Sequence, residues 1–189
     1  MVLEGIITTR DPAGQMHVAA MGPHVGDEAG RTGVIERLSL RPFATSQTAV
    51  NLSMMPEGVF HLVDDVLLFA RVVTKTLTEA PASQTAVRVR GWVLEEACRA
   101  YEFTIDERDT SQERLRYEAR VVMTHEGRPF VGFNRAKHAV VEAAIIVTRM
   151  HLLGAEAIRQ QMLALRPLVE KTGGRREREA WEVIERYVG

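Results

Sequence analysis

The chain has 189 residues, which is enough for one domain with a full core or for one domain with a helical appendage. Hydrophobic residues make up 46% and charged residues 26%, as in ordinary globular proteins, and a formal net charge of −1 gives nucleic-acid binding no electrostatic support. No apolar run approaches the roughly 20 residues of a membrane span, so we expect no membrane partner. The single cysteine, Cys98, excludes an intrachain disulfide and suits a reducing cytoplasm.

The first third of the chain predicts four strands. A β-branched run, a turn with Pro12 and Gly14, and a second apolar run predict a hairpin. After a charged, glycine-bearing loop, an alternating run predicts a third strand, and a fourth follows the turn around Pro56 and Gly58. The four predicted strands are residues 2–9, 16–21, 34–40 and 59–63.

The turn after the third strand combines hydroxyls, an amide and a guanidinium. Pro42 ends the strand, and Ser46 or Thr45 is a suitable N-cap for a short helical turn. Such a turn leaves backbone N–H groups and hydroxyls pointing the same way, which predicts a phosphate site with Arg41 as its charge partner. An ordinary capped turn with a surface arginine is the alternative.

The middle of the chain predicts one helix and two long strands. Asp64 and Asp65 precede the apolar run 66–73, which predicts a helix with an acidic start; a paired-carboxylate site is the alternative. Residues 86–105 and 114–125 carry charges at many second positions, as strands with one solvated face do. We therefore expect a long hairpin or barrel wall joined by residues 106–112, followed by a turn and a short segment, 130–133.

From Asn134 onward the pattern is helical. Apolar residues recur at helical spacing in 134–150, 155–171 and 175–188, with breaks at Gly154 and Gly173 and a bend expected at Pro167. The order of the predicted elements, with the strands first and the helices last, indicates the α+β class. We expect a β-rich part that closes into a barrel and a C-terminal helical layer. We expect residues 134–189 to pack on the barrel formed by residues 1–133.

Common catalytic motifs are missing from the sequence. It contains no GxGxxG, GxxxxGK[ST], HExxH or GxSxG pattern, so dinucleotide-fold, P-loop, zinc-protease and hydrolase readings lack their signatures. His138 and Glu142 stand four apart on one helix face, but a surface pair explains them better than a metal site. We therefore expect no metal, and no residue can be assigned as a catalytic acid or base.

Three stretches together carry a family resemblance. The first is VAAMGP at 18–23, and the third is GFNRAKHAVVEAA at 132–144. The second contains RPF at 41–43, followed by Ser46, Thr48, Asn51 and Leu52, and then GVFHLVDD at 58–65. The chain resembles the flavin-binding split-barrel proteins, and more narrowly an uncharacterised family of FMN-binding proteins in that superfamily. The superfamily also contains pyridoxamine phosphate oxidase and flavin reductases.

The resemblance implies a flavin-binding split β-barrel, FMN as cofactor and a homodimer. It implies that Ala20, Met21, Gly22 and Pro23 lie along the isoalloxazine ring and that Arg41, Ser46, Thr48 and Asn51 surround the phosphate and ribityl chain. Pyridoxamine phosphate oxidase carries two more cations in this turn, where this chain has Gln47 and Thr48. We therefore expect a further phosphate cation from the helix start at Asn134, namely Arg135 or Lys137. The implied function is an FMN-dependent oxidoreductase; a non-catalytic module that stores or senses FMN is the alternative.

Overall fold

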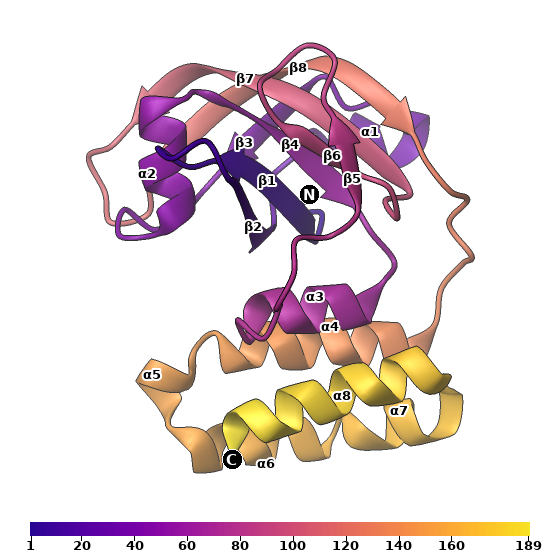
Figure 1. Cartoon of the computed structure of the whole chain (residues 1–189). Helices are drawn as coiled ribbons and strands as arrows, with labels where there is room; N and C mark the ends of the chain where they lie inside the picture. Colours follow the sequence, from indigo (N-terminus) through magenta and orange to yellow (C-terminus); the bar gives the residue numbers. More distant parts are fainter. The chain divides into compact units, whose positions relative to one another are not determined.

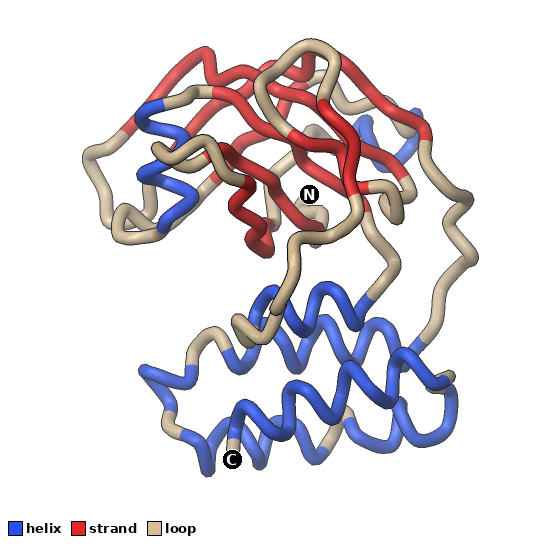
Figure 2. The backbone as a smooth tube through the Cα atoms, in the orientation of Figure 1, coloured by secondary structure: helices blue, strands red, loops and turns tan.

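The computed structural model describes residues 1–189 and divides them into two units. The barrel unit comprises residues 1–63 and 80–129, and the helical unit comprises residues 64–79 and 130–189. In Figure 1 the strands and helices carry their labels, and Figure 2 shows strands in red and helices in blue. The segment 64–79, which the sequence analysis placed within 1–133, belongs to the helical unit.

The barrel unit is built on an antiparallel sheet. Its strand order is β2-β1-β4-β7-β8-β3, so the edge strands are β2 and β3. Isolated bridges from His24 reach both Val2 and Ser39, which ties the end of β2 to β3 and curls the sheet. The six strands are β1 Gly5–Arg10, β2 Met16–Met21, β3 Arg37–Leu40, β4 Glu57–Leu62, β7 Arg99–Asp109 and β8 Arg116–Glu126.

The predicted N-terminal hairpin is present, because β1 pairs with β2 around a turn at Asp11–Gly14. Gly14 has a φ of 84°, a left-handed conformation that suits glycine, and the Asp11 carboxylate accepts from the N–H of Gln15 at 2.7 Å. Two short helices complete the ends of the curled sheet. They are α1 Glu28–Thr32, where the sequence predicted a loop, and α2 Gln47–Met54.

The two faces of the sheet are buried differently. The inner face carries the main core, in which the rings of Phe60 and Tyr101 stack with centroids 6.4 Å apart. On the outer face a small cluster around Val59 and Ala100 is covered by the segment 83–95, which contains β5 Ser83–Thr85 and β6 Trp92–Leu94. The inner core also contains Ile7, Leu38, Leu40, Leu52, Phe103 and Tyr117.

The prediction of one long strand over 86–105 is wrong. Residues 86–91 form a loop, only 92–94 form β6, and the next strand runs from Arg99 to Asp109. The loop folds over the outer face because the carboxylate of Glu102 accepts hydrogen bonds from three of its backbone N–H groups. Residues 106–109 were predicted to belong to the connection between the two long strands. They instead extend β7, and they are exposed to solvent.

Six helices make up the helical unit, and an N-cap side chain begins the first two of them. Asp65 caps the first of them, and Asn134 caps the second with its side-chain oxygen. The predicted helix over 155–171 is interrupted before Pro167, which stands in the first turn of a new helix. The six are α3 Val66–Val73, α4 Arg135–Val147, α5 Met150–Leu153, α6 Ala155–Leu163, α7 Arg166–Thr172 and α8 Arg175–Val188.

The helical core uses small side chains on α4 and larger ones on its neighbours. Ala139, Ala143 and Ala144 are fully buried, which lets the backbones of adjacent helices approach closely, and Ile158 and Ile184 fill the space around them. None of these helices has both the length and the hydropathy needed to cross a lipid bilayer.

Candidate functional site

The turn after β3 and the start of α2 form a polar site at one end of the barrel unit. Ser46, one of the two predicted candidates, is the N-cap: its Oγ accepts from the N–H of Ala49 at 3.2 Å and donates to the carbonyl of Phe43 at 2.7 Å. The first helical hydrogen bond of α2 runs from the N–H of Val50 to the carbonyl of Ser46. The N–H groups of Gln47 and Thr48 therefore have no acceptor within the helix and face outward from its first turn.

A network of polar side chains fixes α2 against the first hairpin. The side-chain amide of Asn51 donates to Thr9 Oγ1 at 2.9 Å and accepts from the amide of Gln47 at 2.7 Å. One turn earlier, Thr48 Oγ1 lies 3.4 Å from His17 Nε2. Asn51 is 1% exposed and both ends of its amide are bonded inside the protein, so it holds α2 in place, and its contact with FMN stays a prediction.

Arginines mark both ends of α2. Arg108 donates to the carbonyls of Leu52 and Ser53 at 3.0 and 3.1 Å, which satisfies acceptors at the C-terminal end of the helix. Arg41 lies before the N-terminal end and is exposed. Beside it, the guanidinium of Arg114 stacks 4.0 Å from the ring centroid of Phe43. An anion at the N-terminus of α2 would therefore meet backbone N–H groups and cationic side chains together.

The segment Ala20–Pro23 lies where the edge strand β2 ends. Ala20 and Met21 pair with Ile6 and Gly5 of β1 on one side, and no strand pairs with β2 on its other side. Ala20, Met21 and Gly22 are partly exposed, whereas Pro23 is buried and its carbonyl accepts from Leu3 at 3.1 Å. An unpaired strand edge offers N–H and C=O groups that a planar ligand with its own donors and acceptors can use.

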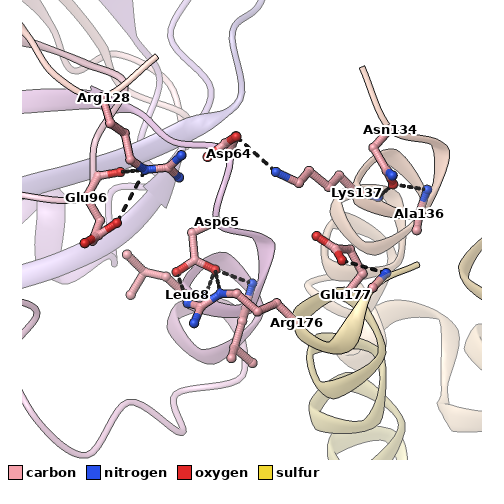
Figure 3. Close-up of polar contacts among 12 residues, drawn as sticks. Asp64, Asp65, Leu68, Glu96, Arg128, Asn134, Ala136, Lys137, Arg176 and Glu177 are labelled. Carbon is pink, nitrogen blue, oxygen red and sulfur yellow. Dashed lines mark hydrogen bonds and ion pairs between the residues drawn. The ribbon is translucent and has the colours of Figure 1, made fainter. Parts of the chain in front are cut away.

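Asn134, Arg135 and Lys137 belong to the helical unit, and Figure 3 shows the contacts of Asn134 and Lys137. Asn134 Oδ1 accepts from the N–H groups of Ala136 and Lys137 at 2.8 and 3.1 Å, and its Nδ2 donates to the carbonyl of Thr172 at 3.1 Å. Lys137 Nζ lies 3.0 Å from Oδ2 of Asp64, whose side chain is 2% exposed. Arg135 is exposed. The phosphate roles of these residues remain predictions.

Asp64 and Asp65 start a helix, and Figure 3 shows that they point to different cations. Asp65 accepts from the N–H groups of Leu67 and Leu68 at 3.0 and 3.3 Å and forms an ion pair with Arg176. Asp64 pairs with Lys137 at 3.0 Å. Because each carboxylate serves a separate structural contact, the helix-start interpretation explains both residues better than a shared proton does.

The sequence analysis did not identify one fully buried titratable group of the barrel unit, Glu102. Glu102 is fully buried, and it accepts from the N–H groups of Val87, Arg88 and Val89 at 2.7, 2.6 and 3.0 Å and from His125 Nε2 at 2.6 Å. Burial alone would raise its pKa, but the three N–H groups and His125 together hold the pKa below its usual value. The alternation of charges around Glu102 looks like a solvated strand face, so the sequence carried no signal of this role.

His17, at the α2 site, is another residue that the sequence analysis did not select. The alternation of side chains along β2 was the available signal, because His17 lies opposite Thr9 in the hairpin and its side chain is on the same face of the sheet as that of Thr9. No three histidine, cysteine, aspartate or glutamate side chains come together as a metal site would require.

Comparison with known proteins identifies relatives of the whole chain. The family model described as "Protein of unknown function (DUF447) N-terminal domain" matches residues 3–128, and "Protein of unknown function (DUF447)" matches residues 134–186. An FMN-bound protein of Methanosarcina mazei, described as a DUF447 member, is similar in structure over 98% of this chain and 94% of its own, with a TM-score of 0.83 and 22% identity. Among curated protein sequences there is no match.

More distant structures share the barrel. The flavin reductase of styrene monooxygenase from Pseudomonas putida S12 covers 68% of this chain and 82% of its own, with a TM-score of 0.53 and 11% identity. The flavin reductase HpaC complexed with NADP+ covers 70% and 82%, with a TM-score of 0.54 and 11% identity. These likenesses confirm the α+β class and the split-barrel fold that the sequence resemblance predicted.

Proposed function

We propose, from the premise that this chain belongs to the family described as protein of unknown function DUF447, that its barrel unit binds FMN along β2 and at the start of α2. The observation that carries the proposal is the first turn of α2, where the N–H groups of Gln47 and Thr48 have no acceptor within the helix and where the exposed Arg41 precedes the helix by a few residues. An FMN-bound member of the same family supports it.

The length of β2 suits an elongated cofactor. FMN has its phosphate and its ring at opposite ends of a ribityl chain. His17, near the α2 turn, and Ala20 are three residues apart in β2, which corresponds to about 10 Å at about 3.3 Å per residue. The phosphate would then bind at α2, and the ring would lie along Ala20, Met21, Gly22 and Pro23, beside the unpaired edge of the strand.

Each residue of the α2 turn has a distinct part in this proposal. Ser46 and Asn51 keep the turn in shape, because their side chains are bonded inside the protein. Arg41 and Thr48, together with the backbone, supply charge and donors to the phosphate. Bound FMN would supply the redox chemistry, and the protein would fix its ring and shape a substrate pocket.

The first test is FMN binding to purified protein, with riboflavin as a ligand that lacks the phosphate. Arg41→Ala is expected to weaken FMN binding about ten- to a hundredfold, because a charge-assisted contact contributes about 1.5–3 kcal/mol. Riboflavin affinity should stay unchanged. Flavin fluorescence quenching measures both, and Arg88→Ala, at an exposed site on the covering loop, is the matched control. Equal FMN affinity in wild type and Arg41→Ala would remove Arg41 from the site.

We propose further that the flavoprotein is a cytoplasmic oxidoreductase acting on a small molecule. The flavin reductases among the structural neighbours support a redox role, and the single cysteine supports a reducing compartment. Reduction of the bound flavin by NADH or NADPH, followed by reoxidation with an acceptor over many turnovers, is the expected result. Tight binding with no turnover for any donor would instead favour storage or sensing of FMN.

A homodimer is expected in solution. Large apolar side chains lie exposed in residues 130–133, with Phe130, Val131 and Phe133 exposed by 54, 81 and 103%. Consecutive apolar side chains in water usually mark a contact surface. Sedimentation velocity at micromolar concentration should give the mass of a dimer, and Phe133→Ser should shift the equilibrium toward monomer. A monomer at tens of micromolar wild-type protein would contradict this prediction.

A further inference from the structure

His17 sits where the hairpin meets the first turn of α2. In the β1–β2 register it lies opposite Thr9, whose hydroxyl accepts from Asn51 at 2.9 Å. His17 Nε2 lies 3.4 Å from Thr48 Oγ1, and Thr48 and Asn51 are three residues apart on one helix face. The hairpin therefore contacts α2 through two parallel pairs, Thr9 with Asn51 and His17 with Thr48.

The two pairs differ in exposure and in length. Thr9 and Asn51 are each 1% exposed and form a bond of normal length, as a permanent structural contact does. His17 is partly exposed, and its 3.4 Å contact is longer than the usual range of about 2.7–3.2 Å. Its ring is thus free to adjust toward a ligand at the neighbouring N–H groups of Gln47 and Thr48.

We propose that His17 is a second cationic group of the phosphate site and that it takes up a proton when the FMN phosphate binds. The inference rests on the FMN site proposed above. Protonated His17 has N–H on both ring nitrogens, so Nε2 can donate to Thr48 Oγ1 while the Thr48 hydroxyl donates to the phosphate. This residue supplies a cation within the barrel unit, whereas Lys137 is engaged with Asp64.

The charges around His17 make protonation depend on the ligand. Burial lowers the pKa of His17 below 6.5, and the nearby Asp11 carboxylate opposes this effect. The hairpin contributes Asp11 and Arg10, and α2 carries no charged residue. Without an anion the ring is therefore neutral near pH 7, and a phosphate dianion at the α2 N-terminus would raise its pKa.

FMN affinity at about pH 8 and about pH 6 tests the inference in wild type and in His17→Gln. The glutamine amide can contact Thr48 but cannot gain charge. We expect affinities within about twofold at the higher pH and about tenfold weaker binding by the variant at the lower pH, a loss equal to one pKa unit. FMN's own phosphate titrates near pH 6 in both proteins, so the ratio of the two affinities isolates His17.

Calorimetry gives an independent readout. Titrations near pH 7 in two buffers with different ionisation enthalpies should show proton uptake on FMN binding by wild type and a smaller uptake by His17→Gln. His151→Gln, at an exposed site on α5, is the matched control and should match wild type. Riboflavin should cause no uptake in any of them.

The outcomes separate the inference from the function on which it rests. FMN binding with identical pH dependence and proton uptake in wild type and His17→Gln overturns the role of His17 and leaves the FMN site intact. Failure of wild type to bind FMN at any pH overturns both. If His17→Gln does not fold, NMR titration of the His17 ring in wild type is the alternative test. An unchanged pKa of this ring on addition of FMN contradicts the inference.

Discussion

Glu102→Ala is expected to lower the free energy of unfolding of the barrel unit by about 3 kcal/mol or more. The fully buried carboxylate accepts from the three consecutive N–H groups of residues 87–89 and from His125 Nε2. Alanine leaves those donors without an acceptor, and each buried unsatisfied donor costs about 1–3 kcal/mol. Partial hydration of the loop keeps the total below the simple sum. Urea denaturation measures the difference.

Glu107→Ala on the same strand is the matched control, because Glu107 is exposed and should change stability by less than about 0.5 kcal/mol. A local readout separates the loop from the rest of the barrel. Amide hydrogen exchange at Val87–Val89 should accelerate in Glu102→Ala, and trypsin should cut faster after Arg88 and Arg90. A variant that loses less than 1 kcal/mol, with unchanged exchange at these amides, would show that the loop is held by other contacts.

Features encoded by neighbouring residues could be predicted from the sequence. The hairpin follows from Pro12 and Gly14 between two apolar runs, and the start of α2 follows from Ser46. The C-terminal helices follow from apolar periodicity, with their breaks at Gly154 and Gly173. In each case a turn or cap within a few residues decides the conformation.

Features that depend on distant residues could not be predicted. Glu102 lies in a stretch where charges alternate, and only the fold shows that residues 87–89 cover it. Lys137 looks like a free cation at a helix start, yet its partner Asp64 is 73 residues earlier. A pattern along the chain reports which face of a strand a residue occupies, but it does not report which other segment lies on that face.

The same distinction between near and distant residues applies to the candidate site. Arg41, Ser46 and Thr48 are close in sequence and lie within or just before one helical turn, so a motif was sufficient to find them. His17 comes from a different strand and reaches that turn only through the packing of α2 on the hairpin. The roles of individual residues toward FMN therefore need the binding experiments, whereas the position of the turn does not.

Acid is expected to destabilise the barrel unit through His61, a fully buried histidine on β4. His61 Nε2 accepts from the N–H of Leu94 at 3.1 Å, so Nδ1 carries the proton and donates to the carbonyl of Ile6 at 3.1 Å. The neutral ring thus joins β1, β4 and β6. The pKa of His61 is lowered to about 4, chiefly by burial and also by the nearby His125, although contacts with the Ile6 and Trp92 backbones oppose the shift.

The direction of the effect follows from proton counting. Between about pH 6.5 and pH 4 the unfolded chain binds a proton at His61 that the folded protein excludes, so stability falls as the pH falls through this window. The contribution is fully present above about pH 6.5. A shift of this size corresponds to about 3 kcal/mol over the window, or up to about 1.4 kcal/mol per pH unit. Glu102, with its lowered pKa, loses its contribution only in stronger acid.

Urea denaturation at several pH values between 7.5 and 5 tests this prediction in wild type and in His61→Gln. The variant should be less stable at neutral pH, because glutamine cannot reproduce both ring contacts, and its stability should depend less on pH in this window. His17→Gln is the comparison, since His17 is only partly buried and should contribute a smaller slope of the same sign. If His61→Gln does not fold, NMR titration of wild type decides: a His61 ring that protonates near pH 6.5 in the folded protein would contradict the buried neutral state.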